Sequence, residues 1–195
     1  MKKQKRQIEP LFTSANDWHY NACLNWSHDP LELYTIGYKD GADRLVNAVL
    51  ESKNMQDALI YPICFLYRQY IELRLKEIIH SGRMLLGEGR GFPQHHKISS
   101  LYKTAKEIIK EVYSGEELPD LSLVDHVVSE YSHIDPDSFS FRYPFDKSGR
   151  NVLDGRTHIN LRHLSDIIKE FGEIIDNISC AISVCLDHKR EFSEF

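Results

Sequence analysis

Apolar residues recur every three or four positions along most of this 195-residue chain, which is the spacing of amphipathic α-helices. Five such stretches are separated by residues that favour turns. They predict helices over about residues 29–52, 55–80, 98–113, 121–132 and 160–188. The last stretch is the most regular, because large apolar residues from Leu161 to Ile182 all fall on one stripe of a helical wheel.

The pattern changes between residues 134 and 159. Phe139, Phe141 and Tyr143 alternate with polar residues, and a turn sequence at residues 146–149 leads to a short apolar run. This alternation predicts a short β-hairpin. We therefore expect an all-α fold, a helical bundle of about five helices with a short β-hairpin inserted before the long C-terminal helix.

The first 28 residues differ from the rest of the chain. Residues 1–8 are basic and typical of a frayed tail, and the aromatic stretch from Trp18 to Trp26 has no regular period. We expect that stretch to pack across the domain surface. Two parts are predicted: an N-terminal tail and aromatic arm, residues 1–28, and a helical domain, residues 29–195.

Composition narrows the possible functions. Hydrophobic residues make up 42% and charged residues 27% of the chain, as in globular proteins, and the net charge of −5 excludes a surface that is basic all over. The longest apolar run, about ten residues from Ala58, is too short for a bilayer that needs about 20. No apolar stretch of a signal peptide follows the N-terminus. We expect a cytoplasmic protein with no membrane contact.

The four cysteines form no metal-ligand or zinc-finger spacing with one another or with histidines. They predict free buried thiols in a reducing compartment. Motifs of phosphate-binding loops, serine nucleophiles and dinucleotide sites are missing from the sequence. We therefore expect no metal site and no cofactor.

Two helical stretches carry polar residues on apolar faces. Arg74 predicts a buried ion pair, with an acid of residues 135–137 as the candidate partner and phosphate contact as the alternative. Arg68 and Glu72, four residues apart, predict a pair on the helix surface.

In the last helix, Ser165, Gly172 and Ser179 recur seven residues apart. Small residues let another helix approach closely, so this stripe predicts either an internal helix contact or the seam of a dimer.

Three segments carry a resemblance to a known family. They are YPICFLYRQYIELRLKEII at residues 61–79, His96-Lys97-Ile98, and DPDSFSFRYP at residues 135–144, followed by the long terminal helix. Over about residues 58–187 the chain resembles prokaryotic stand-alone members of the HEPN (higher eukaryotes and prokaryotes nucleotide-binding) domain family. The resemblance implies an all-α bundle that is commonly a homodimer. Many members are metal-independent ribonucleases of toxin–antitoxin and phage-defence systems, and others are inactive binding modules.

The ribonuclease members carry an arginine followed, after four to six residues, by a histidine near the start of the final helix. Arg156 and His163 match that spacing and position, so the resemblance implies that they are catalytic. The histidine would move a proton at the ribose 2′-OH or the leaving 5′-oxygen, and the arginine would hold the phosphate. A two-fold dimer would bring both copies to one cleft. The alternative for His163 is a solvated surface histidine.

The residues around this pair are basic. Residues 142–162 contain five lysines and arginines and two aspartates, a net charge of +3. We expect an RNA- or phosphate-binding patch formed by Arg142, Arg150, His158 and Arg162. The alternative is that these arginines pair with the acidic segment 106–137, which we expect to face away from RNA and which a basic partner could use.

Three functions remain open from the sequence. The first is a homodimeric, metal-independent endoribonuclease acting as a toxin or phage-defence effector. The second is a catalytically inactive HEPN-like module that dimerises and binds RNA, a nucleotide or a protein. The third is a subunit that acts only through a partner protein, such as an antitoxin.

Overall fold

The computed structural model describes residues 10–27 and 29–193, and it divides into two compact units, residues 1–30 and 31–195. In the described part of the first unit, the regular element is a short 3₁₀-helix, η1 (Trp18–Tyr20). The basic tail at residues 1–8 lies outside the described residues. The packing of the aromatic arm across the domain surface stays a prediction.

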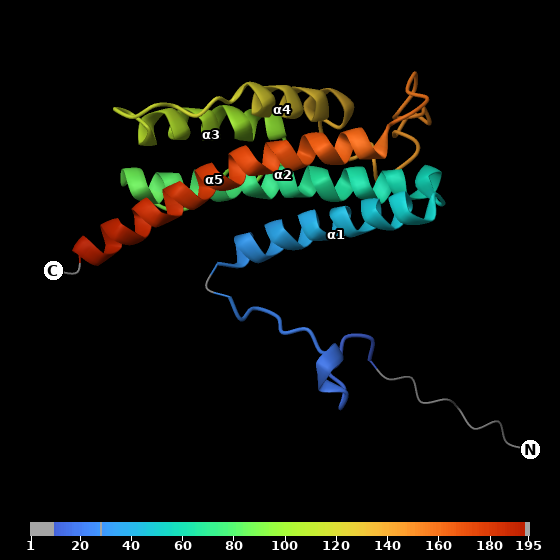
Figure 1. Ribbon diagram of the computed structural model, residues 1–195, viewed down its shortest axis with the longest axis horizontal. Helices are drawn as coiled ribbons and strands as arrows, with labels where there is room; N and C mark the ends of the chain where they lie inside the picture. The colour runs from blue at the N-terminus through green and yellow to red at the C-terminus, as the bar shows by residue number, and fades with distance from the viewer. Residues whose placement is uncertain (1–9, 28, 194–195) are drawn as a thin grey trace, which may run out of the picture. The chain divides into compact units, whose positions relative to one another are not determined.

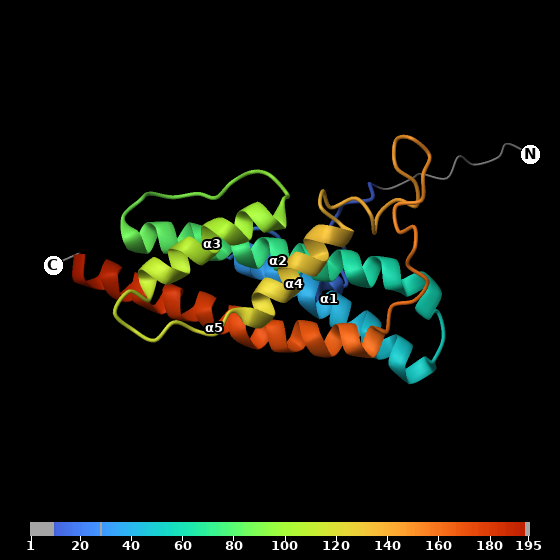
Figure 2. The same ribbon diagram turned by 90° about the horizontal axis from the view of Figure 1, so that it is seen from above.

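Five α-helices span most of the second unit, as Figures 1 and 2 show. They are α1 (Pro30–Ser52), α2 (Gln56–Leu86), α3 (Ile98–Val112), α4 (Ser122–Ile134) and α5 (Leu161–Ser193). The expected all-α helical bundle is therefore confirmed. Within the described chain, none of these helices combines the length and apolarity that crossing a membrane requires.

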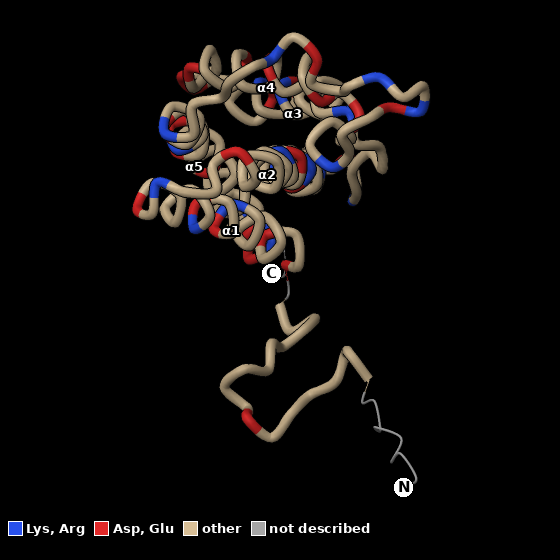
Figure 3. Tube along the Cα trace, turned by 90° about the vertical axis from the view of Figure 1, so that its right-hand side faces the viewer, with Lys and Arg blue, Asp and Glu red and all other residues tan. Residues whose placement is uncertain are grey.

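Helix α2 is the centre of the bundle. Figure 3 looks along it and shows α1, α5 and the α3–α4 pair placed around it. Its buried residues from Ile63 to Gly82 point to several sides of the helix, and α3 and α5 are its main contacts. A helix buried on several sides must also bury its polar residues, and these need partners inside the protein.

Helix α2 also runs further than its sequence predicts. A stop was expected at Ser81-Gly82, but Gly82 lies inside the helix, where a Cβ would clash with the side chain of Ile108 in α3. The glycine allows α3 to approach closely rather than ending the helix. The end comes at Gly87, whose φ of 81° forms a left-handed cap.

The expected β-hairpin is wrong. Among the described residues between α4 and α5 there is one isolated antiparallel bridge, from Phe145 to Asn151. The carboxylate of Asp146 accepts hydrogen bonds from the amides of Ser148 (2.8 Å) and Arg150 (3.0 Å), which folds the turn onto its own side chain. Pro144, next to the bridge, has no amide hydrogen with which to extend a ladder. The segment is therefore a loop rather than two strands.

A buried arginine ties three segments together. The side chain of Arg68 is 0% exposed, and its guanidinium donates to Glu72 (2.9 Å), to the carbonyl of His96 (2.6 Å) and to the carbonyl of Asp135 (3.2 Å). The carboxylate of Asp135 lies 3.3 Å from the same guanidinium. The expected surface pair of Arg68 and Glu72 thus forms, but inside the protein, because α2 is buried on this side.

Glu72 has two further partners, Lys76 at 2.8 Å and the imidazole of His96 at 2.8 Å. Burial by itself raises the pKa of Glu72, but the hydrogen bonds from Lys76, His96 and Arg68 and the charge of Lys76 together outweigh it. The pKa of this carboxyl is therefore lowered, and Glu72 is ionised at neutral pH. Its charge is held between two cations in the bundle.

Arg74 forms the buried ion pair that its position predicts, but with other partners than expected. Its guanidinium contacts Glu77 (2.7 Å) and Asp176 of α5 (2.8 Å), not an acid of residues 135–137. Asp135, an acid of that loop, forms an ion pair with Arg68 instead. A helical wheel shows which face a residue occupies but not which loop will cover it.

The small-residue stripe of α5 faces α2. The hydroxyl of Tyr67 donates to Ser165 (3.3 Å), and a Cβ on Gly172 would lie 3.1 Å from the hydroxyl of Tyr70. Ser179 is buried and donates to Glu77 of α2. The stripe is therefore an internal helix contact, as the first of the two interpretations predicts.

The cysteines are less buried than expected. Cys64 of α2 is buried, whereas Cys23, Cys180 and Cys185 are exposed. Burial, with the nearby charge of Asp135, raises the pKa of Cys64 to about 12. Its thiol is therefore neutral at physiological pH.

We predict that a thiol reagent titrates three cysteines in the folded protein. The thiolate is the reactive form, and Cys64 combines burial with a raised pKa, so it should react only after denaturation. Absorbance with an aromatic disulfide reagent measures the count. Cys64→Ser should still give three native thiols, while the matched Cys180→Ser gives two. Four thiols reacting at one rate in the folded protein would contradict this burial.

We also predict that Glu72→Gln lowers the free energy of unfolding by about 3–5 kcal/mol at pH 7, because the buried Lys76 then has no carboxylate and Arg68 keeps only that of Asp135. Urea unfolding measures the difference. The pKa of Glu72 is lower in the folded state than the ordinary value of about 4.3. The wild type is therefore more stable than Glu72→Gln above that pH. This difference in the free energy of unfolding is lost as pH falls through the lowered pKa of Glu72.

The matched control is Asp40→Asn, which breaks an exposed pair with Arg44 at the same four-residue spacing. We expect its unfolding curve to overlay that of the wild type. A Glu72→Gln variant as stable as this control would show that the buried network contributes nothing to stability.

Candidate functional site

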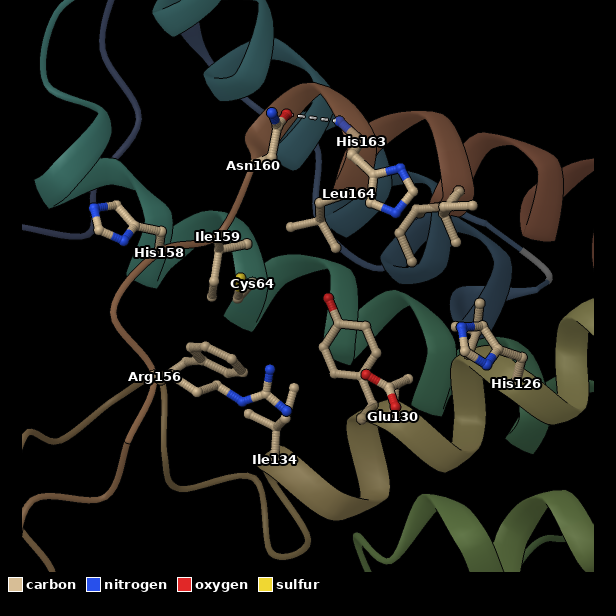
Figure 4. A pocket seen from close by; sticks show the side chains of 15 residues that line it. Cys64, His126, Glu130, Ile134, Arg156, His158, Ile159, Asn160, His163 and Leu164 are labelled. Carbon is tan, nitrogen blue, oxygen red and sulfur yellow. Dashed lines mark hydrogen bonds between the residues drawn. The ribbon is translucent and has the colours of Figure 1, made fainter. Parts of the chain in front are cut away.

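A pocket of about 270 Å³ lies between α4 and α5, where α5 begins, and Figure 4 shows the fifteen side chains that line it. We call it the α4/α5 pocket. Helix α4 contributes His126 and Glu130, α5 contributes His163, and the segment before α5 contributes Arg156. Cys64 of α2 also lines it. Polar groups from four separate parts of the chain therefore meet in one cavity.

The two residues predicted to be catalytic both line the α4/α5 pocket. Figure 4 shows Arg156 entering from the loop and His163 from α5 on another side. The amide of Arg156 donates to the carbonyl of Leu153 (3.2 Å), so a turn presents the arginine. No carboxylate of the described chain forms an ion pair with its guanidinium. The arginine is thus available for an anion from outside.

The start of α5 adds partial positive charge beside the pocket. The side chain of Asn160 accepts a hydrogen bond from the amide of His163 (3.0 Å) and caps the helix. The first turn of α5 contains no acidic residue to offset the helix dipole. A phosphate or carboxylate near His163 would therefore be stabilised by the helix as well as by Arg156.

His126 and Glu130 are pocket residues that sequence reasoning missed. They are four residues apart and so share one face of α4. That spacing is the signal that could have singled them out. We expected the acidic segment 106–137 to face away from RNA, yet Glu130, which belongs to it, lines the same pocket as Arg156.

Tyr131 provides a neutral hydrogen-bond donor on the pocket lining. Its side chain is 6% exposed, and its hydroxyl has no partner among the described residues. Burial raises the pKa of Tyr131 well above its ordinary value, so the hydroxyl keeps its proton. A buried donor without an acceptor is unfavourable, so this enclosed hydroxyl costs free energy.

The loop that carries Arg156 is anchored to the buried network. The carboxylate of Asp135 accepts hydrogen bonds from the amides of Phe139 (2.5 Å) and Ser140 (2.8 Å), and Gln69 of α2 donates to Ser138 (3.0 Å). The next residue, Phe141, is buried and lines the α4/α5 pocket. The segment DPDSFSFRYP therefore forms the fixed base of the loop.

The four residues predicted to bind RNA or phosphate are placed differently. His158 lines the α4/α5 pocket. Arg142 does not line it, and its Nε donates to the carbonyl of Ser138 (2.6 Å). Arg150 pairs with Asp146 in its own turn (3.0 Å), and the exposed Arg162 does not line the pocket. The basic segment is thus split between a binding pocket and local structure.

The set of groups in the pocket suits acid–base chemistry on an anion. Three imidazoles, from His126, His158 and His163, line the pocket, and histidine is the side chain most often used for proton transfer in enzymes; Arg156 can stabilise negative charge. Cys64 is a neutral thiol and so a poor nucleophile. In the described chain, no cluster of three histidine, cysteine, aspartate or glutamate side chains is arranged to hold a metal ion.

Comparisons with known proteins found no match for this chain among protein-family models, curated proteins or solved structures. The function of the α4/α5 pocket is therefore inferred from its own residues and their geometry.

Proposed function

We propose that the α4/α5 pocket binds a phosphodiester of single-stranded RNA and cleaves it without a metal ion. The observation that carries this proposal is that Arg156 and His163 line one pocket together with two further histidines, His126 and His158. The unpaired arginine and the start of α5 favour the phosphate, and the imidazoles supply proton transfer. One chain therefore contains both a cation for the phosphate and two groups that can serve as base and acid.

The reaction uses the 2′-OH of the substrate as the nucleophile. One imidazole, from His163 or His126, takes the 2′-OH proton as the oxygen attacks phosphorus. The other imidazole gives a proton to the 5′-oxygen as the P–O5′ bond breaks. The products are a 2′,3′-cyclic phosphate and a 5′-OH, and no water or metal enters this step. Arg156 stabilises the charge that develops on the equatorial oxygens.

The resemblance to HEPN ribonucleases supports the same proposal, and with it a role as a toxin or phage-defence effector. In that family two subunits bring their motifs to one cleft. Here one chain lines the α4/α5 pocket with more than one histidine, so acid and base need not come from different subunits. A homodimer, a partner protein and a cytoplasmic location stay predictions.

A second candidate function is nucleotide binding without cleavage. It is favoured by the apolar side chains that share the pocket with the polar ones, among them Ile134, Ile159 and Leu164. Such a lining suits the face of a nucleobase. An inactive HEPN-like module would use the same pocket for this purpose.

We predict that Arg156→Ala and His163→Ala each reduce cleavage of a labelled single-stranded RNA by about 10²–10⁴-fold, the range of a lost acid–base group or charge stabiliser. The assay contains EDTA and follows the 2′,3′-cyclic phosphate product by gel and mass spectrometry. Both side chains are exposed, so the thermal unfolding midpoint should not change.

Two variants serve as matched controls. His188→Ala removes an exposed histidine near the far end of α5, and Arg44→Ala removes an exposed arginine of α1. Both should cleave like the wild type. Unchanged cleavage in His163→Ala would end the nuclease proposal. Binding that is lost in Arg156→Ala, with no product from any form, would instead establish the second candidate.

A further inference from the structure

A second depression, of about 720 Å³, lies beside the α4/α5 pocket on the loop between α4 and α5, which projects from the helices in Figures 1 and 2. We call it the loop depression. Its lining includes Tyr61 from the start of α2 and Arg142, Tyr143 and Arg156 from the loop. The side chains of Tyr61 and Tyr143 are 48% and 50% exposed. Two aromatic rings and two arginines thus share one open surface.

The ring of Tyr143 is held in place before any ligand binds. It stacks on Phe139 with centroids 4.8 Å apart and an interplanar angle of 27°. The guanidinium of Arg142 lies 5.5 Å from the centroid of the same ring and is fixed by its bond to Ser138. A ring that is already ordered loses little conformational entropy when a ligand stacks on it.

The charge of the loop depression favours an anionic ligand. No carboxylate of the described residues forms an ion pair with Arg142 or Arg156, so both cations are open to solvent and ligand. Asp154 also lines the depression, and its carboxylate accepts the amide of Gly155 (3.0 Å). Figure 3 shows both kinds of charge along this loop. With two arginines and one aspartate, the lining nevertheless has a net positive charge.

The loop depression adjoins the α4/α5 pocket. Arg156 and Phe141 line both cavities. A chain whose phosphate lies in the pocket can therefore pass Arg156 and enter the depression without leaving the surface. Exposed aromatic rings alternating with arginines are the surface that unstacked bases and their phosphates recognise.

We propose that the loop depression binds the nucleotides of a single-stranded RNA that lie next to, and beyond, the two nucleotides joined by the scissile phosphate. A base contacts the half-exposed ring of Tyr143, a neighbouring base contacts Tyr61, and Arg142 and Arg156 hold the phosphates between them. This inference rests on the proposed function, because it requires RNA in the α4/α5 pocket. It makes the substrate single-stranded, since the bases of a duplex have no free faces.

The test compares two ligands in four proteins. The ligands are a ten-nucleotide 2′-O-methyl RNA, which cannot be cleaved, and an unmodified RNA dinucleotide, which reaches only the pocket. The proteins are the wild type, Tyr143→Leu, Tyr143→Phe and the His188→Ala control. Fluorescence anisotropy measures the affinity for the long strand, and chromatography measures cleavage of the dinucleotide.

We expect Tyr143→Leu to weaken binding of the long strand by about 5- to 150-fold, the loss associated with one stacked base. Tyr143→Phe should bind like the wild type, because the ring is kept. Dinucleotide cleavage should be equal in all four proteins. Since Tyr143 is half exposed, thermal unfolding should also be unchanged.

Equal affinity of Tyr143→Leu and wild type for the long strand would overturn the inference. Equal affinity for duplex and single-stranded RNA would overturn it too. No binding of the long strand would also overturn it, and would indicate that this surface contacts a protein instead. The proposed function fails in a different way: the dinucleotide is then not cleaved by any form, whereas the long strand still binds through Tyr143.

Discussion

The buried guanidinium of Arg68 is the constraint on which the rest of this bundle depends. It is fully enclosed, so every hydrogen bond it lacks would cost free energy. Its partners come from three places: Glu72 in α2 itself, the carbonyl of His96 before α3, and Asp135 directly after α4. The entry to one helix and the exit from another are thereby fixed to the central helix.

Asp135 connects the buried Arg68 to the candidate site. Asp135, which contacts Arg68, also accepts hydrogen bonds from two backbone amides of the following turn. That turn leads to Phe141, which is buried and lines the pocket. The long loop that presents Arg142 and Arg156 thus starts from a rigid base. Functional groups carried on loops are useful when a rigid scaffold positions them. The buried ion pairs of Arg68 therefore help to position the residues that line the pocket.

Local periodicity was enough to predict five helices and to place most of their ends within a few residues. It failed where a distant segment decides the outcome. Gly82 looks like a helix end but makes room for Ile108, and the hairpin pattern at residues 139–153 is interrupted by hydrogen bonds to the side chain of Asp146. The spacing of Arg68 and Glu72 predicted their pairing, but it carries no information on burial. Burial depends on what covers α2.

The candidate site, too, could be predicted from the sequence only in part. The motif spacing singled out Arg156 and His163, and both line the α4/α5 pocket, but His126, Glu130 and Tyr131 were missed. These three lie on α4, far from the motif in sequence, and meet it only because α4 packs beside α5. Sequence reasoning finds residues within one segment, whereas a pocket is made where segments meet.

The most direct test of the central claim is a crystal structure of the protein with a 2′-O-methyl RNA dinucleotide, whose phosphodiester stays intact. We predict density for the phosphate in the α4/α5 pocket, with the guanidinium of Arg156 and the imidazole of His163 within hydrogen-bond reach of its oxygens. A dinucleotide bound elsewhere on the molecule, with the pocket empty, would contradict it.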